Sequence, residues 1–356
     1  MTGAVALPEA PLTTDGALTV TAVADADAAA WTSFVNSRPD ATGYHDWPWR
    51  DVIVRTFGHE PVYLAARRDG QVAGVLPLVF IDSRIFGRSL TSLPFLNYGG
   101  VLAEDAAAGE ALVSAAADLA KARGCLHVEL RHIGRQFPML PARQHKVTML
   151  LTLQGGLWEK LDRKVRNQVR KAQKSNLVAE HGGIELVGDF YTVFTRNMRD
   201  LGTPVYARVL FEEVLRAFPD RAALHVVRHE GKPVAAGLTF RTRGTTEVPW
   251  ASSIRDYNSL CPNHLLYWSI IERALELGCD TLDFGRSTPG EGTFKFKEQW
   301  GAQAVPLHWE YKLLPGAEVP NVSPTNPKYR LMIETWKRLP LGVANFLGPH
   351  IVGSIP

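Results

Sequence analysis

The residues most able to do chemistry gather in one stretch, DFGRSTPGEGTFKFKEQWGA, residues 283–302. A carboxylate at Asp283 can orient an attacking amine or accept its proton. Arg286 can hold a carboxylate or phosphate of a substrate. A fixed cation at Lys297 can stabilise the negative charge that acyl transfer to an amine builds on the carbonyl oxygen. These residue types would suit such a reaction, and Lys297, Asp283 and Arg286 are the catalytic candidates.

Each candidate also has a simpler interpretation. Lys297 can be an exposed helix lysine, and Asp283 can close the end of its strand or bond to Arg286. The four glycines and the aromatic rings of the stretch favour function, because they let the chain bring Arg286 and Lys297 toward one cleft. Phe296, directly before Lys297, is a candidate substrate contact.

Two local structures suit residues 293–301. Phe296 and Trp300 are four residues apart, which places them on one face of a helix, and Gly301 can end it. The alternation of polar and aromatic residues over 293–297 would also suit a strand. We prefer the helix because the glycine cap is present, and we expect a strand over 303–311.

Two parts of the chain repeat the same plan. Residues 62–80 and 224–241 each hold two apolar runs joined by an acidic residue and a glycine, the signal of a β-hairpin. Residues 109–131 and 263–285 each predict an amphipathic helix, a glycine cap and a strand. The shared order of these blocks implies a duplicated domain.

A hairpin, further strands, a helix and another strand resemble the GNAT type of acyltransferase fold. The predicted fold class is therefore α/β (α+β): two tandem GNAT-like domains, with mixed, mostly antiparallel sheets flanked by helices. We expect an N-terminal extension and first strand over 1–38, the first domain over 39–155, the second and catalytic domain over 156–315, and a C-terminal tail over 316–356.

A strongly basic helix is predicted in WEKLDRKVRNQVRKAQKSN, residues 158–176, which holds seven Lys or Arg and two acids. Arg166 and Arg170 stand one helical turn apart, a suitable pair for phosphates. A solvated helix is the usual fate of a charge run. The excess of cations favours a phosphate-bearing partner, either tRNA or a nucleotide-linked precursor, and Arg166 and Arg170 as its contacts.

Three further residues are candidate substrate contacts. Tyr206 can line a pocket or pack in the core. Asn97 and Tyr98 precede a Gly-Gly pair and can wall a substrate groove between the halves or shape a turn. His264, on an amphipathic segment, is expected to be a packed or surface histidine rather than a catalytic one.

Composition limits the other classes of function. A length of 356 residues suggests two domains, and a net charge of +3 is too small to indicate nucleic acid by itself. The three cysteines, Cys125, Cys261 and Cys279, have neither metal-ligand spacing nor a disulfide framework. We therefore expect no metal site and a cytoplasmic protein.

The two ends of the chain predict no membrane span. The first segment lacks an early basic residue and contains Pro8 and Pro11, so we expect no signal peptide. The final LPLGVANFLGPHIVGSIP has no acidic residue, Lys or Arg, but its prolines and glycines disfavour a transmembrane helix. It can pack on the body or make weak contact with a membrane or a partner.

No good copy of the acetyl-CoA signature occurs in the chain. That signature, Gln/Arg-x-x-Gly-x-Gly/Ala, opens a helix whose N–H groups bind pyrophosphate. RSTPGEG, residues 286–292, is one residue too long and follows the wrong strand. The sequence therefore disfavours acyl-CoA as the acyl donor, although the fold resembles that of CoA users, and no cofactor is predicted with certainty.

Several of these motifs carry a resemblance. The tandem plan and GTFKFKEQWGA (292–302) resemble the Fem-type aminoacyltransferases, double-GNAT enzymes that add amino acids from aminoacyl-tRNA to peptidoglycan precursors and share a Phe-Lys-x-x-Phe/Trp-Gly element. Four segments more closely resemble the Fem-related branch of exosortase (PEP-CTERM) and exopolysaccharide systems: PFLNYGG (94–100), RDLGTPVYAR (199–208), PNHLLYW (262–268) and DFGRS (283–287). The resemblance covers about residues 40–315.

The resemblance implies an N-acyltransferase or aminoacyltransferase. It places Lys297, preceded by Phe296, where the Fem lysine stands at the acyl-transfer site. The acceptor would be an amine on a cell-envelope, peptidoglycan-like or exopolysaccharide precursor. The sequence lacks the coiled-coil heptads of a helical arm, so the resemblance does not imply tRNA use. A CoA-dependent GNAT N-acetyltransferase and a non-catalytic duplicated scaffold that binds a nucleotide-linked precursor are the alternatives.

Overall fold

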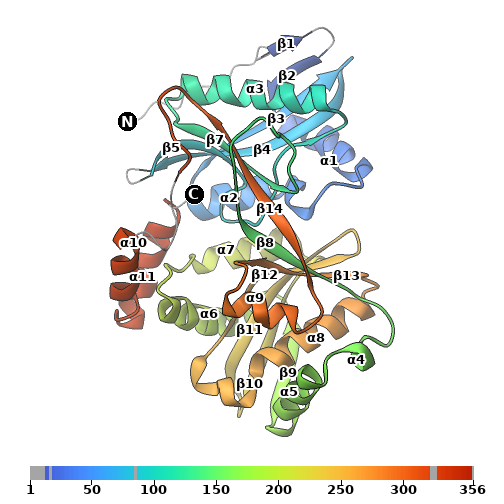
Figure 1. The fold of residues 1–356 in the computed structure, drawn as a ribbon, viewed down its shortest axis with the longest axis vertical. Helices are drawn as coiled ribbons and strands as arrows, with labels where there is room; N and C mark the ends of the chain where they lie inside the picture. The colour runs from blue at the N-terminus through green and yellow to red at the C-terminus, as the bar shows by residue number, and fades with distance from the viewer. Residues whose placement is uncertain (1–12, 16–17, 84–85, 321–326, 355–356) are drawn as a thin grey trace. The chain divides into compact units, whose positions relative to one another are not determined.

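The computed structural model describes residues 13–15, 18–83, 86–320 and 327–354 (Figure 1). The chain divides into two compact units. Unit 1 consists of Met1–Gln144, Pro306–Pro320 and Ser354–Pro356, and unit 2 consists of His145–Val305 and Asn321–Gly353.

Unit 1 is built on one sheet with the strand order β1-β2-β3-β4-β5-β7-β14, and β6 pairs with β4. Its neighbouring strands are antiparallel except for the parallel pair β5 and β7. The strands are β1 (Thr13–Asp15), β2 (Leu18–Ala22), β3 (Glu60–Arg68), β4 (Gln71–Ser83), β5 (Gly87–Ser92), β6 (Leu102–Ala103), β7 (His127–Ile133) and β14 (Gln303–Leu313). The helices are α1 (Ala28–Ser37), α2 (Trp49–Phe57) and α3 (Ala106–Ala122), with short 3-10 turns at Asp25–Asp27 and Gly43–His45.

In unit 2 the strand order is β8-β13-β12-β11-β10-β9, and among these pairs only β12 and β13 are parallel. The strands are β8 (Ala142–Thr152), β9 (Leu177–Gly182), β10 (Ala222–His229), β11 (Lys232–Thr242), β12 (Thr245–Ser253) and β13 (Thr281–Ser287). The helices are α4 (Leu157–Lys160), α5 (Arg163–Lys174), α6 (Val187–Leu201), α7 (Arg208–Ala217), α8 (Pro262–Glu276), α9 (Gly292–Glu298), α10 (Pro327–Trp336) and α11 (Leu341–Val352), with 3-10 turns at Ile184–Leu186 and Arg255–Leu260.

The repeated hairpins and helix caps are confirmed. The turns between β3 and β4 and between β10 and β11 have positive φ at both central residues: 51° and 80° at Asp69-Gly70, and 51° and 78° at Glu230-Gly231. Such turns match the twist of the strands that they join. Gly124 and Gly278 follow α3 and α8 with φ of 64° and 71°, the left-handed geometry of a helix C-cap.

Each unit contains a strand that the chain supplies from far away in the sequence. The antiparallel neighbour of β7 is β14, with Glu129 opposite Tyr311. The antiparallel neighbour of β13 is β8, with Asp283 opposite Leu150. Both compact units are discontinuous in sequence, because Pro306–Pro320, with most of β14, belongs to unit 1, and Asn321–Gly353, with α10 and α11, belongs to unit 2.

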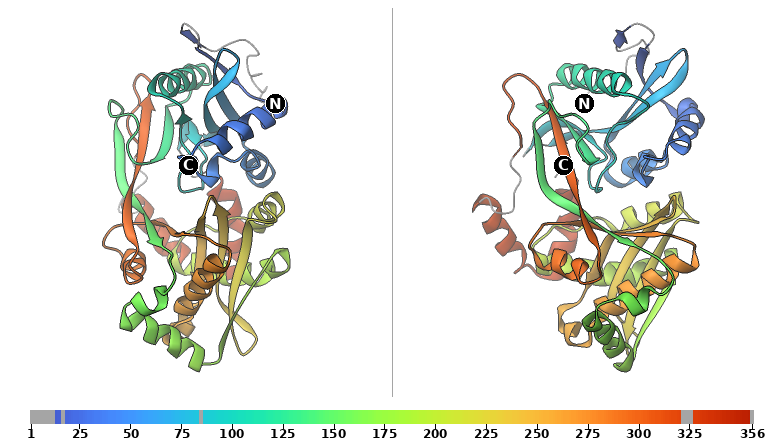
Figure 2. Two further views of the ribbon diagram at one scale, coloured as in Figure 1. Left: turned by 90° about the vertical axis from the view of Figure 1, so that its right-hand side faces the viewer. Right: turned by 45° about the vertical axis from the view of Figure 1, so that its right-hand side comes forward.

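Helices cover both faces of the sheet in unit 2. α8 and α5 share one apolar core with β13, β12 and the aromatic residues of α9. α6 packs on β11 and β12 from the other face, and Figure 2 shows α6 and α8 on opposite sides of these strands. In unit 1, α3 forms the core with the strands β2 to β7. The predicted fold class, mixed and mostly antiparallel sheets flanked by helices, is confirmed.

The helix predicted over 293–301 forms as α9 and the strand after it as β14. α9 ends at Glu298, and Gly301 turns the chain with a φ of 86°. The C-terminal segment contains α10 and α11. None of the helices in the described parts of the chain has the length and apolar character needed to cross a bilayer.

Candidate active site

The candidate active site lies in unit 2, where β12 and β13 part. These parallel strands pair only over Thr245–Glu247 and Thr281–Asp283. Beyond that point β12 continues along β11, and β13 continues along β8. Glu247 and Asp283 form the last pair, and their side chains are 5% and 1% exposed. Two buried carboxylates therefore stand together where the pairing ends.

A bulge in β13 fixes the Asp283 carboxylate. The register shifts between Asp283 and Arg286, and Gly285 adopts a φ of 74°, which favours glycine. This geometry lets the Gly285 N–H donate to Asp283 Oδ1 at 2.7 Å. The Thr148 hydroxyl on β8 donates to the same oxygen at 2.5 Å. The orientation of the carboxylate is therefore set by two hydrogen bonds from within the sheet.

Lys297 is a buried residue, 7% exposed, on the short helix α9. Its ammonium donates to the carbonyl oxygens of Gly285 at 2.9 Å and Arg286 at 3.1 Å. Burial lowers the pKa of Lys297 to about 8; Arg286 adds to this shift, while Asp283 and Glu247 oppose it. The interpretation of Lys297 as an exposed helix lysine is wrong, because its cation is fixed on the β13 bulge.

Two further cations lie near this bulge. Arg286, half-buried, is opposite Thr148 in the register of β13 and β8. The Lys146 ammonium donates to Thr288 Oγ1 at 2.6 Å. Burial lowers the pKa of Lys146, the charge of Arg286 lowers it further, and Glu291 opposes both. The site therefore combines positive charge with the carboxylates of the last strand pair.

Aromatic rings hold α9 in its place. The ring of Phe296 lies 5.4 Å from that of Tyr267 and 6.3 Å from that of Trp300. Half-buried His264 packs 5.1 Å from Phe296, and burial together with Lys164 lowers the pKa of His264 to about 4. Packing explains His264, as expected, and Phe296 helps to anchor Lys297. Contact of Phe296 with substrate stays a prediction.

Sequence reasoning missed Glu247, Thr148 and Lys146. Glu247 had one available signal, because it is the charged residue in the strand TTEVPWASS. A charge in an otherwise apolar or small-residue strand is costly unless it is paired or functional. Thr148 and Lys146 had no comparable signal, since only the pairing of β8 with β13 brings them here.

The basic segment predicted as one helix over 158–176 forms two helices, α4 and α5, because the backbone is extended at Leu161, and α5 packs with α8. Arg166 is half-buried, and its Nε atom is buried with no hydrogen-bond partner among the described residues. The guanidinium of Arg170 lies 5.5 Å from the ring centroid of Trp158. Within the described residues, no hydrogen bond or ion pair joins either arginine to the catalytic candidates.

Tyr206 packs on the carboxylate face of the sheet. Its ring lies 6.4 Å from that of Trp250 on β12. On β11, Leu238 pairs with Trp250, and Phe240 pairs with Glu247. Leu238 and Phe240 are two residues apart on the strand, so their side chains, and those of their partners, share one face of the sheet. Tyr206 is thus on the same side of the sheet as Glu247, and its role in binding substrate stays a prediction.

Asn97 and Tyr98 are both buried in unit 1. The Tyr98 ring packs edge-on against that of Tyr44 at 5.1 Å. Tyr98 also lines a cavity of about 250 Å³ in unit 1, together with Thr42, His45 and Gln136. Packing accounts for the tyrosine, and its part in a substrate groove stays a prediction.

In the region of unit 1 that corresponds to the candidate site, the buried charged side chains are paired with each other. Arg131 Nε donates to Glu129 Oε1 at 2.7 Å, with both side chains buried. The Arg131 guanidinium lies 4.2 Å from the ring centroid of Trp309. The two charges neutralise each other, and the aromatic ring covers the cation.

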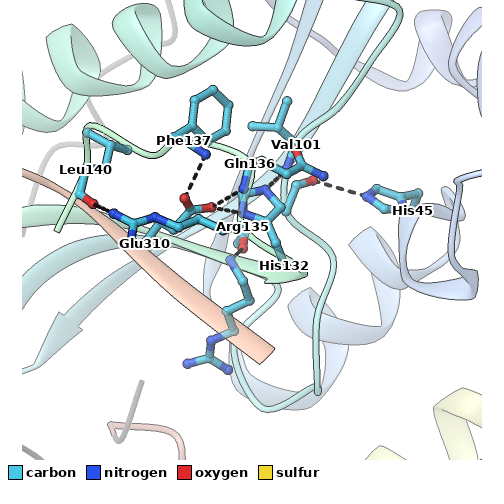
Figure 3. Close-up of polar contacts among 11 residues, drawn as sticks. His45, Val101, His132, Arg135, Gln136, Phe137, Leu140 and Glu310 are labelled. Atoms are coloured by element: carbon cyan, nitrogen blue, oxygen red, sulfur yellow. Dashed lines mark hydrogen bonds and ion pairs between the residues drawn. The ribbon is translucent and has the colours of Figure 1, made fainter. Parts of the chain in front are cut away.

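A second network in unit 1 ties loops to the sheet (Figure 3). The Val101 N–H donates to His132 Nε2 at 2.8 Å, so Nδ1 carries the proton and donates to Glu310 Oε2 at 2.7 Å. The Phe137 N–H donates to Glu310 Oε1 at 2.7 Å. Burial would raise the pKa of Glu310, but the hydrogen bonds from His132, Phe137 and Gln136 hold it below its ordinary value. Both nitrogens of His132 are engaged, so this network is structural.

The unit 2 site has the parts that acyl transfer to an amine requires. It holds carboxylates that can orient an amine or take its proton. It also holds a fixed ammonium that can face developing negative charge. Among the described residues, no group of His, Cys, Asp or Glu side chains is placed to hold a metal ion.

Comparison with known families gives one match. The acetyltransferase (GNAT) domain matches residues 160–298. This range runs from the last residue of α4 to the last residue of α9 and includes all three catalytic candidates. No curated protein matches the sequence.

Solved structures match the fold over most of the chain. FemX is 15% identical with a TM-score of 0.62, over 88% of this chain and 99% of that one. The C-terminal domain of a putative lysylphosphatidylglycerol synthetase from Agrobacterium fabrum is 13% identical with a TM-score of 0.55, over 81% and 92%. A tandem GNAT protein from the clavulanic acid biosynthesis pathway is 13% identical with a TM-score of 0.53, over 83% and 97%. The protein has a tandem GNAT fold, and its GNAT-type domain supports a transferase.

Proposed function

We propose that the protein is an N-acyltransferase or aminoacyltransferase whose catalytic residues are those of unit 2. The observation that carries this proposal is the buried Lys297 ammonium. It is fixed on the carbonyls of Gly285 and Arg286, near the carboxylates of Asp283 and Glu247. A buried cation is costly, and groups with perturbed pKa cluster at functional sites.

The reaction joins the acceptor nitrogen to the carbonyl carbon of the donor and breaks the donor's ester C–O or thioester C–S bond. Asp283 orients the amine, Glu247 takes its proton, and this proton passes to the leaving oxygen or sulfur. Lys297 and Arg286 stabilise the oxyanion of the tetrahedral intermediate. Removal of one such donor typically lowers the rate about 10²–10³-fold.

The proposed acceptor is an amine on a cell-envelope, peptidoglycan-like or exopolysaccharide precursor, reached from the cytoplasm. The Phe-Lys-x-x-Trp-Gly element at residues 296–301 and the similarity in fold to FemX support this class. The four segments that resemble the exosortase-associated branch support an acceptor from an exopolysaccharide system. Phosphate groups of this precursor, or of a tRNA donor, would bind at Arg166 and Arg170.

A CoA-dependent N-acetyltransferase is the second candidate, favoured by the match to the acetyltransferase (GNAT) domain. The start of α8 argues against it. Pro262 is the first residue of α8, so that position has no N–H to offer a pyrophosphate. This disfavours CoA relative to aminoacyl-tRNA as the donor.

The test is binding of the purified protein to acetyl-CoA, bulk aminoacyl-tRNA and UDP-linked amino-sugar precursors in parallel. A ligand that binds only the folded state raises the unfolding temperature, and titration then gives its affinity. We expect a response to aminoacyl-tRNA or to the UDP-linked precursors, weakened by Arg166→Ala and Arg170→Ala. A response to acetyl-CoA alone would replace this proposal with the CoA-dependent one.

A catalytic role is separated from a scaffold role by transfer of radiolabel from the donor that binds. Lys297→Met is expected to keep binding and to lose transfer. Lys295→Met, an exposed lysine of the same helix, is the matched control and should transfer normally. No transfer by the wild type from a donor that it binds would support the scaffold instead. Equal transfer by Lys297→Met and the wild type would show that Lys297 is not a catalytic residue.

A further inference from the structure

The two C-terminal helices expose large apolar side chains. Leu331 and Met332 of α10 are 72% and 59% exposed, and Phe346 of α11 is 70% exposed. Val343 and Leu347 of α11 are exposed as well. These five residues are named the C-terminal apolar surface below. Exposed apolar patches on a folded protein commonly mark a contact site.

The sides of α10 and α11 that face away from the C-terminal apolar surface pack on unit 2. Gly202, after α6, lies so near α10 that a Cβ on it would stand 2.6 Å from Ile333 Cγ2. Gly348 of α11 lies so near the residues that follow α6 that a Cβ on it would stand 2.8 Å from Val205 Cγ1. Both helices therefore pack on residues 202–205, and the C-terminal apolar surface is a fixed feature of the fold.

α11 carries no charged residue and exposes several apolar side chains. Its buried residues Ala344, Gly348 and Val352 follow one face at helical spacing. Its exposed side holds Phe346 and Leu347 beside the polar His350, and residues 339–356 contain no Lys, Arg, Asp or Glu. Large apolar side chains that gather on an exposed face commonly mark a contact site.

The same segment has an excess of basic residues. Residues 327–356 hold four basic residues, Lys328, Arg330, Lys337 and Arg338, and one acid, Glu334, which gives the segment a net charge of +3. Lys337 and Arg338 are exposed between the two helices, and the Lys337 ammonium lies 2.7 Å from Glu334 Oε1.

We propose that α10 and α11 bind the surface of a bilayer that contains anionic lipids. The C-terminal apolar surface would enter the boundary between headgroups and acyl chains, and Lys337 and Arg338 would meet the lipid phosphates. Such a bilayer is apolar at its acyl chains and negatively charged at its phosphates, so an apolar helix next to a cationic segment complements both. This inference is independent of the proposed transferase function.

The test is flotation of the full-length protein with vesicles of phosphatidylcholine, alone or mixed with phosphatidylglycerol. We expect binding to the anionic vesicles. The variant Leu331→Ser/Phe346→Ser should bind at least about tenfold more weakly, because it removes two apolar side chains from the contact. Met139→Ser, which changes a 94% exposed residue of unit 1, is the matched control and should bind as the wild type does.

The charges are tested separately. Lys337→Gln/Arg338→Gln should weaken binding to anionic vesicles by roughly fivefold for each basic residue removed and leave binding to neutral vesicles unchanged. Wild-type protein that does not float with anionic vesicles overturns the proposal, as does a Leu331→Ser/Phe346→Ser variant that floats like the wild type. A wild-type dimer that this variant makes monomeric, without vesicle binding, assigns the surface to a second copy and also overturns it.

Discussion

Glu129 in unit 1 and Asp283 in unit 2 occupy the same place in two sheets of the same plan. Each lies on the strand after the capped helix, and each is in the last pair formed with a parallel neighbour, opposite Thr91 in unit 1 and Glu247 in unit 2. Unit 1 places a hydroxyl where unit 2 places a second carboxylate. The two positions therefore differ in charge before any other residue is considered.

One inserted residue makes the second difference. In unit 1, Arg131 follows Glu129 by two positions and pairs with it at 2.7 Å. In unit 2, the bulge at Gly285 places Arg286 three positions after Asp283. The Asp283 carboxylate is held by Thr148 and by the Gly285 N–H, and Lys297 is fixed beside it. The comparison teaches that the same fold can hold a buried carboxylate with a local ion pair or, after one inserted residue, with hydrogen bonds from the backbone and a neighbouring strand.

The largest effect is expected from Glu129→Gln in unit 1. The variant leaves the buried Arg131 cation without its counter-charge, which typically costs about 3–5 kcal/mol of folding free energy. Hydrogen exchange should become faster in β7 and β14, while β10 to β13 keep their protection. The double variant Glu129→Gln/Arg131→Met removes both charges and should recover much of the protection. Unchanged exchange in the single variant would contradict the view of Glu129–Arg131 as a structural pair.

The next effect is expected from Lys297→Met in unit 2, where the loss should be of activity. Transfer should fall about 10²–10³-fold, because the fixed cation no longer faces the developing oxyanion. Folding should not weaken, since replacing a buried charge with an apolar group of similar shape is often neutral or stabilising. Transfer rates and thermal unfolding of Lys297→Met and Lys295→Met, measured side by side, check both statements. If Lys297→Met is less stable than the wild type but its folded fraction transfers at the normal rate, Lys297 has a structural role, as Glu129 does.

A smaller effect is expected in the pH dependence of stability. The pKa of Lys297 is about 8 in the folded protein and near 10.5 for an ordinary lysine. Between these values the folded state has released the proton and the unfolded state still binds it, so the free energy of unfolding rises with pH. From pH 8 to pH 9.5 the wild type should gain about 2 kcal/mol relative to Lys297→Met. Urea unfolding of both proteins across this range measures the gain, and a constant difference between them would refute the lowered pKa.

The smallest effect is expected from Gly285, the inserted residue. Its φ of 74° is a left-handed conformation, which costs a residue with a side chain about 1–2 kcal/mol. Gly285→Ala should lower the unfolding temperature, and Gly285→Asn should lower it less because asparagine tolerates this region. Thermal unfolding of the two variants tests the order. An equal and negligible effect of both would show that the bulge does not depend on glycine.

The sequence by itself determined the local elements of this protein. The hairpin turns at Gly70 and Gly231, the capped helices and the short helix that carries Lys297 follow from patterns within about twenty residues. Such patterns are encoded by turn chemistry and side-chain periodicity, which act between near neighbours in the chain. The same stretch gave Asp283, Arg286 and Lys297 as candidates, because their types and spacing are visible in one segment.

Only the tertiary structure decided which residues surround these candidates. Thr148 reaches Asp283 from 135 residues away because β8 pairs with β13. Glu247 joins the site through three residues of parallel pairing. The burial that lowers the pKa of Lys297 comes from the packing of α9 on this sheet. Strand pairing and burial depend on contacts between distant segments, and no local pattern in the sequence encodes which distant partner a strand will take.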